Sequence, residues 1–149
     1  MALDEDIRVL SSVKLFEGFT HEELRLLAFG AENVVLHADK KLYLQDDEAD
    51  SAYVVVRGRI VLYRESDGGV IGSVGSGAIL GELALVADTR RLTSAAAASE
   101  AELLRLTRRM FRRILEEYPD TAVLLHRRIS EELQAMVRRI EGLAPRFGG

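Results

Sequence analysis

A series of short runs of β-branched and aromatic residues fills the middle of the chain and constrains the fold more than any other feature. Turn-forming residues separate the runs, as in Ser66-Asp-Gly-Gly69. Short strands at such regular spacing are typical of an antiparallel sandwich or barrel, and not of alternating βαβ units. We therefore predict roughly eight antiparallel strands. Their cores lie at residues 34–36, 41–44, 53–56, 60–63, 70–74, 92–98 and 102–106.

Helices are predicted on both sides of this β-rich region. Thr20-His-Glu-Glu23 has the spacing of a capping box, so a helix is expected from residue 22 to 29 or 30, after a shorter one around residues 4–10. On the other side, Thr107 can cap a helix through residue 115. Tyr118-Pro119 ends that helix, and a long one follows over residues 120–141, ending near Gly142 before a frayed tail. The predicted fold class is mainly β with flanking helices, in one domain spanning residues 1–149.

The composition is that of a soluble globular protein and excludes several classes of site. Hydrophobic residues make up 48% of the 149 residues, and charged residues make up 30%. The chain has no cysteine, which excludes disulfides, zinc–thiolate sites and cysteine nucleophiles. The three histidines, His21, His37 and His126, are far apart in sequence, which argues against a metal-dependent enzyme of the cupin kind. We expect no metal, no cofactor and no catalytic residue.

Charge and hydropathy predict a cytoplasmic protein that binds neither a membrane nor a nucleic acid. The acidic start, Met1-Ala-Leu-Asp-Glu-Asp6, leads into no long apolar run and is not a signal peptide. No segment approaches the ~18 apolar residues that span a membrane. The net charge is −4, although residues 101–149 hold 10 basic and 7 acidic side chains. There the signs are interleaved as i,i+4 pairs, such as Arg112–Glu116 and Arg128–Glu132, which is typical of a solvated helix surface.

The predicted long helix carries an apolar stripe whose members are alternately four and three residues apart. Such spacing is a heptad seam, which favours a parallel homodimer through this helix. Packing of the helix onto its own β-region would produce the same stripe, so both interpretations stay open. The stripe consists of Ala122, His126, Ile129, Leu133, Met136, Ile140 and Leu143, widened by Leu125 and Val137.

The segment Gly75–Leu85 carries the strongest functional signal. Three residues separate Gly77 from Gly81, so the dinucleotide-binding G-x-G-x-x-G pattern fails. The Gly-Lys pair of a P-loop and the G-x-S-x-G nucleophile elbow are also absent from the sequence. A glycine-rich turn followed by Gly81-Glu-Leu-Ala-Leu85 instead predicts one short helical turn inside the β-region. The first backbone amides of that turn would be available to an anion.

Glu82 and Arg91 are the charged residues that we associate with this turn. A guanidinium can pair bidentately with a phosphate, and a carboxylate beside the phosphate would accept a hydroxyl donor, such as one from a ribose. The spacing leaves a second interpretation open, in which Glu82 and Arg91 form a salt bridge that closes a loop without any ligand.

The string Gly81-Glu-Leu-Ala-Leu85, with Arg91 ten residues after the glycine, resembles the phosphate-binding cassette of cyclic nucleotide-binding domains. These domains occur in protein kinase A regulatory subunits, cyclic-nucleotide-gated channels and the catabolite activator protein. Leu15-Phe16 and Glu22-Glu-Leu24 resemble the N-terminal helices of the family, and Tyr53–Gly58 resembles its Y-x-V-x-x-G strand and turn. Residues 111–144 align without a gap with the hinge and long dimerisation helix of the catabolite activator.

The resemblance implies a double-stranded β-helix, or jelly-roll barrel, over residues 31–106, with the cassette at 79–93. Helices are implied at residues 1–30 and 107–142. The implied roles are as follows: the amides of Leu83 and Ala84 and the Arg91 side chain hold a cyclic phosphate, Glu82 accepts the ribose 2′-hydroxyl, and Gly81 lets the backbone approach. The implied contacts to the base are Leu62, Ile71 and Val74 from strands, and Met136 and Val137 as an apolar lid.

Two positions depart from the pattern of the family. Leu92 stands where a small residue is usual, and Arg90 replaces the usual proline before the cassette arginine. Leu92 offers only its backbone amide to a ligand, so a hydroxyl that selects guanine would have to come from Thr93 or Ser94. We therefore expect cAMP as the ligand in preference to cGMP.

The resemblance implies a non-enzymatic receptor whose C-terminal helices move against the β-region when a ligand binds. The chain ends soon after the long helix, so we expect a stand-alone domain without a helix-turn-helix module, acting on an unknown downstream protein. The alternative is a ligand-independent dimerisation or scaffold module with a degenerate cassette.

Overall fold

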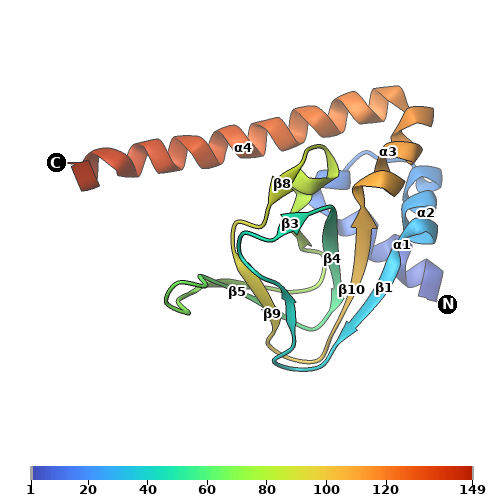
Figure 1. Ribbon diagram of the computed structural model, residues 1–149. Coiled ribbons are helices and arrows are strands. Elements are labelled where there is room, and N and C mark those ends of the chain that lie inside the picture. The colour runs from blue at the N-terminus through green and yellow to red at the C-terminus, as the bar shows by residue number, and fades with distance from the viewer. Residues whose placement is uncertain (1, 149) are drawn as a thin grey trace.

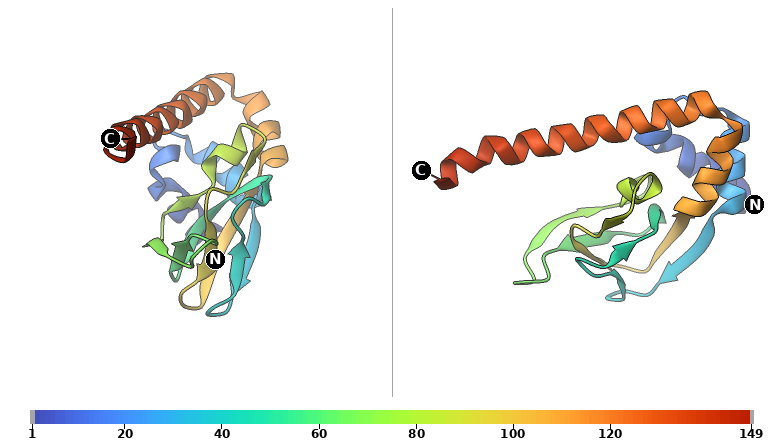
Figure 2. Two further views of the ribbon diagram at one scale, coloured as in Figure 1. Left: turned by 60° about the vertical axis from the view of Figure 1, so that its left-hand side comes forward. Right: turned by 45° about the horizontal axis from the view of Figure 1, so that its top comes forward.

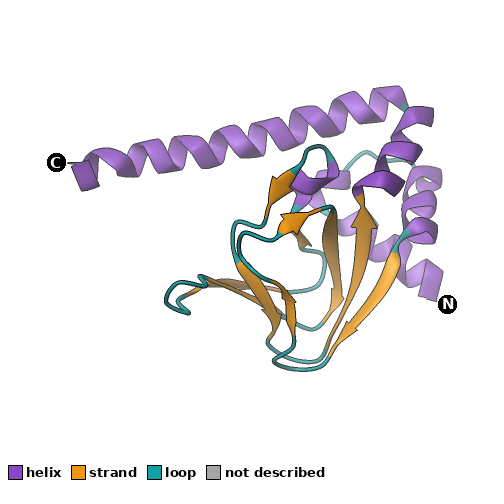
Figure 3. Cartoon of the chain, viewed as in Figure 1, coloured by secondary structure: helices purple, strands orange, loops and turns teal. Residues whose placement is uncertain are grey.

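The computed structural model describes residues 2–148, with side chains for residues 3–135. Helices occupy both ends of the chain and one short turn lies within the β-region (Figure 3). They are α1 (Ala2–Ser12), the 3₁₀ turn η1 (Lys14–Phe16), α2 (His21–Gly30), the 3₁₀ turn η2 (Glu82–Leu85), α3 (Arg108–Glu117) and α4 (Pro119–Gly148).

The strands pair antiparallel throughout the described residues, which confirms the predicted fold class. One sheet has the order β1-β10-β4-β7, a second has the order β2-β9-β5-β6, and β3 pairs with β8 in a short ribbon. The strands therefore lie in separate sheets, so the predicted jelly roll is not a closed barrel. The strands are β1 (Glu32–Leu36), β2 (Lys41–Tyr43), β3 (Glu48–Ala49), β4 (Ser51–Arg57), β5 (Ile60–Tyr63), β6 (Val70–Val74), β7 (Ile79–Leu80), β8 (Thr89–Arg90), β9 (Ser94–Ala97) and β10 (Ala101–Thr107).

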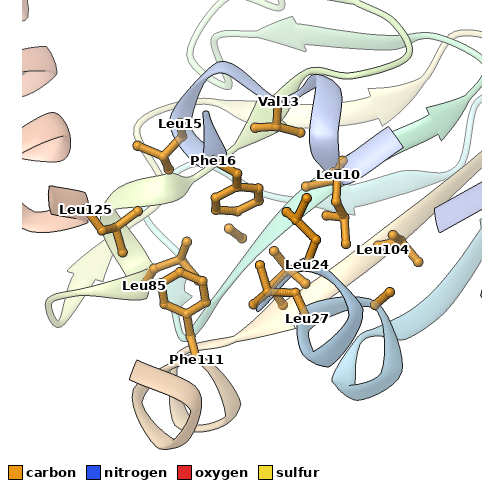
Figure 4. Packing of buried hydrophobic residues seen from close by; sticks show 14 of the residues in the cluster. Leu10, Val13, Leu15, Phe16, Leu24, Leu27, Leu85, Leu104, Phe111 and Leu125 are labelled. Atoms are coloured by element: carbon orange, nitrogen blue, oxygen red, sulfur yellow. The ribbon is translucent and has the colours of Figure 1, made fainter. Parts of the chain in front are cut away.

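Strand β4 is buried on both faces and separates two hydrophobic clusters. Its alternate residues Ala52, Val54 and Val56 pack against the helices, whereas Val55 packs among residues of both sheets. In the cluster on the helix side, η2 contributes Leu85 and α3 contributes Phe111, and both lie close to Leu125 of α4 (Figure 4). The short turn η2 is thus tied to both C-terminal helices through the core.

The predicted helix starts are confirmed by their caps. Thr20 Oγ1 accepts a hydrogen bond from the Glu23 amide at 3.2 Å, and the Thr20 amide donates to Glu23 Oε1 at 2.8 Å, which completes a capping box. Thr107 Oγ1 accepts from the Met110 amide at 3.1 Å at the start of α3.

Two predicted boundaries are wrong, and three short strands were missed. The strand expected from residue 92 begins at Ser94, because the chain first forms the turn that carries Arg91. Three two-residue strands, β3, β7 and β8, were not predicted. Helix α4 continues past Gly142 to Gly148, so the frayed tail is also wrong. A glycine inside a helix costs only about 1 kcal/mol relative to alanine, which does not suffice to end a long helix.

Helix α4 crosses over η2, which we call the cassette turn, and continues beyond the sheets (Figures 1 and 2). The N-terminal part of its apolar stripe packs on its own domain, since Leu125 and Ile129 are buried and Leu133 is 42% exposed. The Arg128 guanidinium donates to the backbone carbonyls of Leu15, at 2.9 Å, and of Glu17. The Arg128–Glu132 and Arg112–Glu116 pairs predicted above do not form within the described residues. Within those residues, no helix is long and apolar enough to cross a membrane.

Candidate functional site

The turn that begins at Gly81 is shaped by a backbone conformation that only glycine adopts readily. Gly81 has φ +71° and precedes η2, so the chain turns sharply from β7 into the 3₁₀ turn. A Cβ atom at this position would lie 2.3 Å from Nη1 of Arg91. Gly81 therefore allows both the turn and the close approach of the guanidinium to the backbone.

The Arg91 side chain is buried, with 6% of its surface exposed, although it carries a full positive charge. Its Nη2 donates to Ser51 Oγ at 3.4 Å, and its guanidinium lies 4.4 Å from the ring centre of Tyr43 and 5.5 Å from that of Tyr53. Among the described residues, Nη1 is buried without a hydrogen-bond partner. Burying such a cation is costly unless an anion pairs with it, so this atom is a candidate for pairing with an anion.

The salt bridge between Glu82 and Arg91 that the spacing left open does not form within the described part of the chain. Glu82 instead faces Glu132 of α4. Burial raises the pKa of Glu82 to about 7, and a hydrogen bond and charge repulsion from Glu132 push it in the same direction. A carboxyl held this way takes up a proton near neutral pH.

A cavity of about 280 Å³ connects the turn, Arg91 and the long helix. Its walls are mainly apolar with a few charged groups, which suits a small ligand that has an anionic group and an apolar part. The walls are formed by Tyr43, Ala49, Leu62, Ile79, Leu80, Gly81, Glu82, Leu83, Thr89, Arg90, Arg91, Leu92, Thr93, Ile129, Glu132 and Leu133.

Most of the site residues expected from the sequence meet in this cavity. They are Leu62, Gly81, Glu82, Leu83, Arg91, Leu92 and Thr93. Ala84 is fully buried behind the turn, and its backbone amide donates to the Gly81 carbonyl at 3.0 Å. Ile71 is 51% exposed on β6, Val74 packs against the core between the sheets, and neither lines the cavity. The side chains of Met136 and Val137 lie outside the described residues.

Sequence reasoning missed the aromatic wall and did not assign Ile129, Glu132 or Leu133 of α4 to the site. Tyr43 lies on β2, and its place beneath Arg91 depends on strand pairing that no local motif encodes. Ile129 and Leu133 belong to the apolar stripe, but the return of α4 over the cavity is a tertiary feature. Within the described residues, no group of three or more histidine, aspartate or glutamate side chains is placed to hold a metal ion.

Comparison with known sequences now bears on this geometry. The family model described as "Cyclic nucleotide-binding domain" matches residues 33–118, which include both sheets, the turn and Arg91. The chain belongs to the cyclic nucleotide-binding domain family. Domains of this family are typically regulatory and not catalytic.

Solved structures of cyclic nucleotide-binding domains share the fold. A cyclic nucleotide-binding-like protein from Brucella abortus is 56% identical, with a TM-score of 0.70 over 76% of this chain and 99% of that one. The catabolite activator protein of Thermus thermophilus is 26% identical, with a TM-score of 0.75 over 87% of this chain and 62% of that one.

A curated relative shows that cyclic nucleotide-binding domains also occur inside much longer chains. The protein named lysophospholipase nte1 from Aspergillus fumigatus is 28% identical over 89% of this chain. This chain spans only 9% of the length of that relative, so the similarity concerns the domain and not the rest of the relative.

Proposed function

We propose that the protein is a non-enzymatic cytoplasmic receptor for cAMP, which it binds in the cavity between the Gly81 turn and α4. The buried Nη1 of Arg91, which lacks a hydrogen-bond partner, is the observation that carries the proposal. The cyclic phosphate would pair with Arg91 and with the amide of Leu83, and the ribose 2′-hydroxyl would donate to Glu82. The amide of Ala84, which donates to the Gly81 carbonyl in this structure, would have to exchange that hydrogen bond for one to the phosphate. The alternative, a scaffold with an internally paired cassette, is disfavoured because the Glu82–Arg91 salt bridge is missing.

Preference for cAMP over cGMP is supported by the apolar walls around Leu62, Leu92 and Leu133. Guanine carries a 6-oxo group and a 2-amino donor, and each costs roughly 1–3 kcal/mol when it is buried without a partner. The resemblance also implies contacts to the base from Ile71, Val74, Met136 and Val137. These contacts remain predictions. Tighter binding of cGMP would mean that Thr93 or Glu132 faces the base.

Signalling is proposed to pass through the long helix. Ile129, Glu132 and Leu133 line the cavity, so a ligand in it would contact α4 directly. A ligand that contacts α4 in only one of its positions shifts the population toward that position. The exposed part of α4 would then offer a changed surface to a second copy and to a downstream protein.

Titration calorimetry tests the proposal with cAMP, cGMP and 2′-deoxy-cAMP as ligands. Arg91→Ala is expected to lower the affinity for cAMP by at least ~10- to 100-fold, because a charge-assisted hydrogen bond is worth about 1.5–3 kcal/mol. Arg59→Ala is the matched control, since Arg59 bonds Ser73 and does not line the cavity. Equal affinities of Arg91→Ala and the unmodified protein would reject the proposed site.

A further inference from the structure

The guanidinium of Arg91 is held by the buried hydroxyl group of Ser51. Ser51 is the first residue of β4, its side chain is 1% exposed, and its Oγ accepts from Arg91 Nη2 at 3.4 Å. The same oxygen accepts a second hydrogen bond, from Nε of Arg105 at 3.2 Å. The two lone pairs of the hydroxyl are therefore both used.

The charges around this hydroxyl are balanced by Asp50. Burial raises the pKa of Asp50, but the Ser51 side chain and the charge of Arg105 outweigh burial and lower that pKa. Arg105 also bonds the two carboxylate oxygens of Asp50, at 3.1 and 3.2 Å, and pairs with Glu32 at 2.7 Å. With two hydrogen bonds accepted from guanidinium groups, Ser51 Oγ has no free lone pair.

Strand pairing explains why these groups meet. Ser51 and Tyr53 lie two residues apart on β4, so their side chains share one face of the sheet. Arg105 is directly opposite Tyr53 on β10 and shares that face. Arg91 enters from the loop between β8 and β9, which is fixed by backbone hydrogen bonds of Arg91 with Asp46 and Asp47.

We propose that Ser51, held by Asp50 and Arg105, is a positioning residue that binds Nη2 of Arg91 and so leaves Nη1 directed toward the ligand. The inference rests on the proposed function, because it assigns Arg91 to the ligand phosphate. Tyr43 supports the flat face of the guanidinium, and Ser51 fixes its rotation within that plane.

The first test needs no ligand. Nuclear magnetic resonance of ¹⁵N-labelled arginine in the free protein measures rotation of the Arg91 Nη groups, which are assigned from their loss in Arg91→Lys. Slow rotation is expected in the unmodified protein and in Ser51→Thr, and fast rotation in Ser51→Ala. Unchanged rotation in Ser51→Ala overturns the inference, whether or not the protein binds cAMP.

The second test separates positioning from a general structural role. Ser51→Ala is expected to weaken cAMP binding on the order of tenfold, and Ser51→Thr is expected to restore most of it. In an Arg91→Lys background, where a single ammonium replaces the forked guanidinium, Ser51→Ala is expected to change the affinity less than threefold.

An equal loss of affinity in both backgrounds would show a structural role and overturn the inference. Thermal unfolding of each variant identifies those that no longer fold. If Ser51→Thr is such a variant, Arg105→Met replaces it as the second test of the same network, with faster Arg91 rotation expected. If the unmodified protein binds no cyclic nucleotide while Ser51→Ala still frees the Arg91 side chain, the proposed function fails and the positioning role stands.

Discussion

At the scale of single residues, a variant of Glu82 tests the proposed contact to the ribose separately from the proposed contact to the phosphate. Glu82→Ala is expected to weaken cAMP binding strongly and 2′-deoxy-cAMP binding little. Only cAMP has the 2′-hydroxyl group from which Glu82 would accept a hydrogen bond. Parallel titrations of both ligands measure the difference, which should approach about 1–3 kcal/mol. Equal losses for the two ligands would assign Glu82 a structural role.

The raised pKa of Glu82 makes a second prediction. The pKa of this carboxyl rises from 4.5 to about 7 on folding, so between these two pH values the folded protein holds a proton that the unfolded chain has lost. The stabilising contribution of the protonated carboxyl is present below the unfolded pKa and is lost as pH rises through about 7. Ionised Glu82 is the better acceptor for a ribose hydroxyl, so cAMP affinity is expected to rise over the same range.

Glu132→Gln tests the cause of this pH dependence. Removing the facing carboxyl lowers the pKa of Glu82, so the rise in cAMP affinity should move to lower pH. Titrations from about pH 5 to about pH 9 measure the midpoint, with the neighbouring Glu131→Gln as a control. The same midpoint in Glu132→Gln and in the unmodified protein would contradict the pairing of the two carboxyls.

The limits of sequence reasoning are visible at this scale. Gly81, Glu82 and Arg91 could be placed in one site because their types and spacing match a local turn and a nearby cation. Tyr43 and Ser51 could not, since their contacts to Arg91 come from chain segments 48 and 40 residues away. Ile71 and Val74 were assigned to the base through the family resemblance, and such a positional match does not show which face of a strand lines the cavity.

At the scale of elements, Arg108 links the cassette turn to α3. Its Nη1 donates to the carbonyls of Ala84 and Ala87, at 3.4 and 2.6 Å, and its Nη2 pairs with Asp88 at 2.8 Å. The side chain thus ties the end of η2 to the start of α3, so a displacement of the turn is transmitted to the helix.

Arg108→Met is expected to lower the free energy of unfolding by about 1–2 kcal/mol, because two carbonyls lose their charged donor. Arg109→Met is the matched control, since Arg109 is exposed and has no ion pair among the described residues. Urea denaturation of the two variants measures the difference. Equal stability of the two would show that Arg108 does not couple η2 to α3.

Whole elements were more predictable than their ends. Runs of β-branched and aromatic residues between turn residues indicated the long strands, and capping residues indicated the helices, because both depend on local sequence. Strands β3, β7 and β8 have two residues each and exist only through their pairing partners. No periodicity can be recognised in two residues.

At the scale of the whole molecule, the long helix decides the assembly. We predict a parallel two-helix homodimer through the part of α4 that follows Ile129, because Leu125 and Ile129 are buried in their own domain whereas Leu133 is 42% exposed. Sedimentation of Leu133→Glu combined with Met136→Glu should show a folded monomer. A monomeric unmodified protein at micromolar concentration would contradict the prediction.

The buried guanidinium of Arg91 has a consequence for the amount of protein in a cell. Without a ligand, the protein holds a desolvated charge that a bound phosphate would neutralise. A ligand that binds only the folded chain stabilises it by about 2.7 kcal/mol when it is present at 100 times its dissociation constant. Chaperones and proteases remove unfolded chains continuously, and a difference of this size changes abundance several-fold. Turnover of the receptor would then follow the supply of its ligand, with unoccupied copies degraded first.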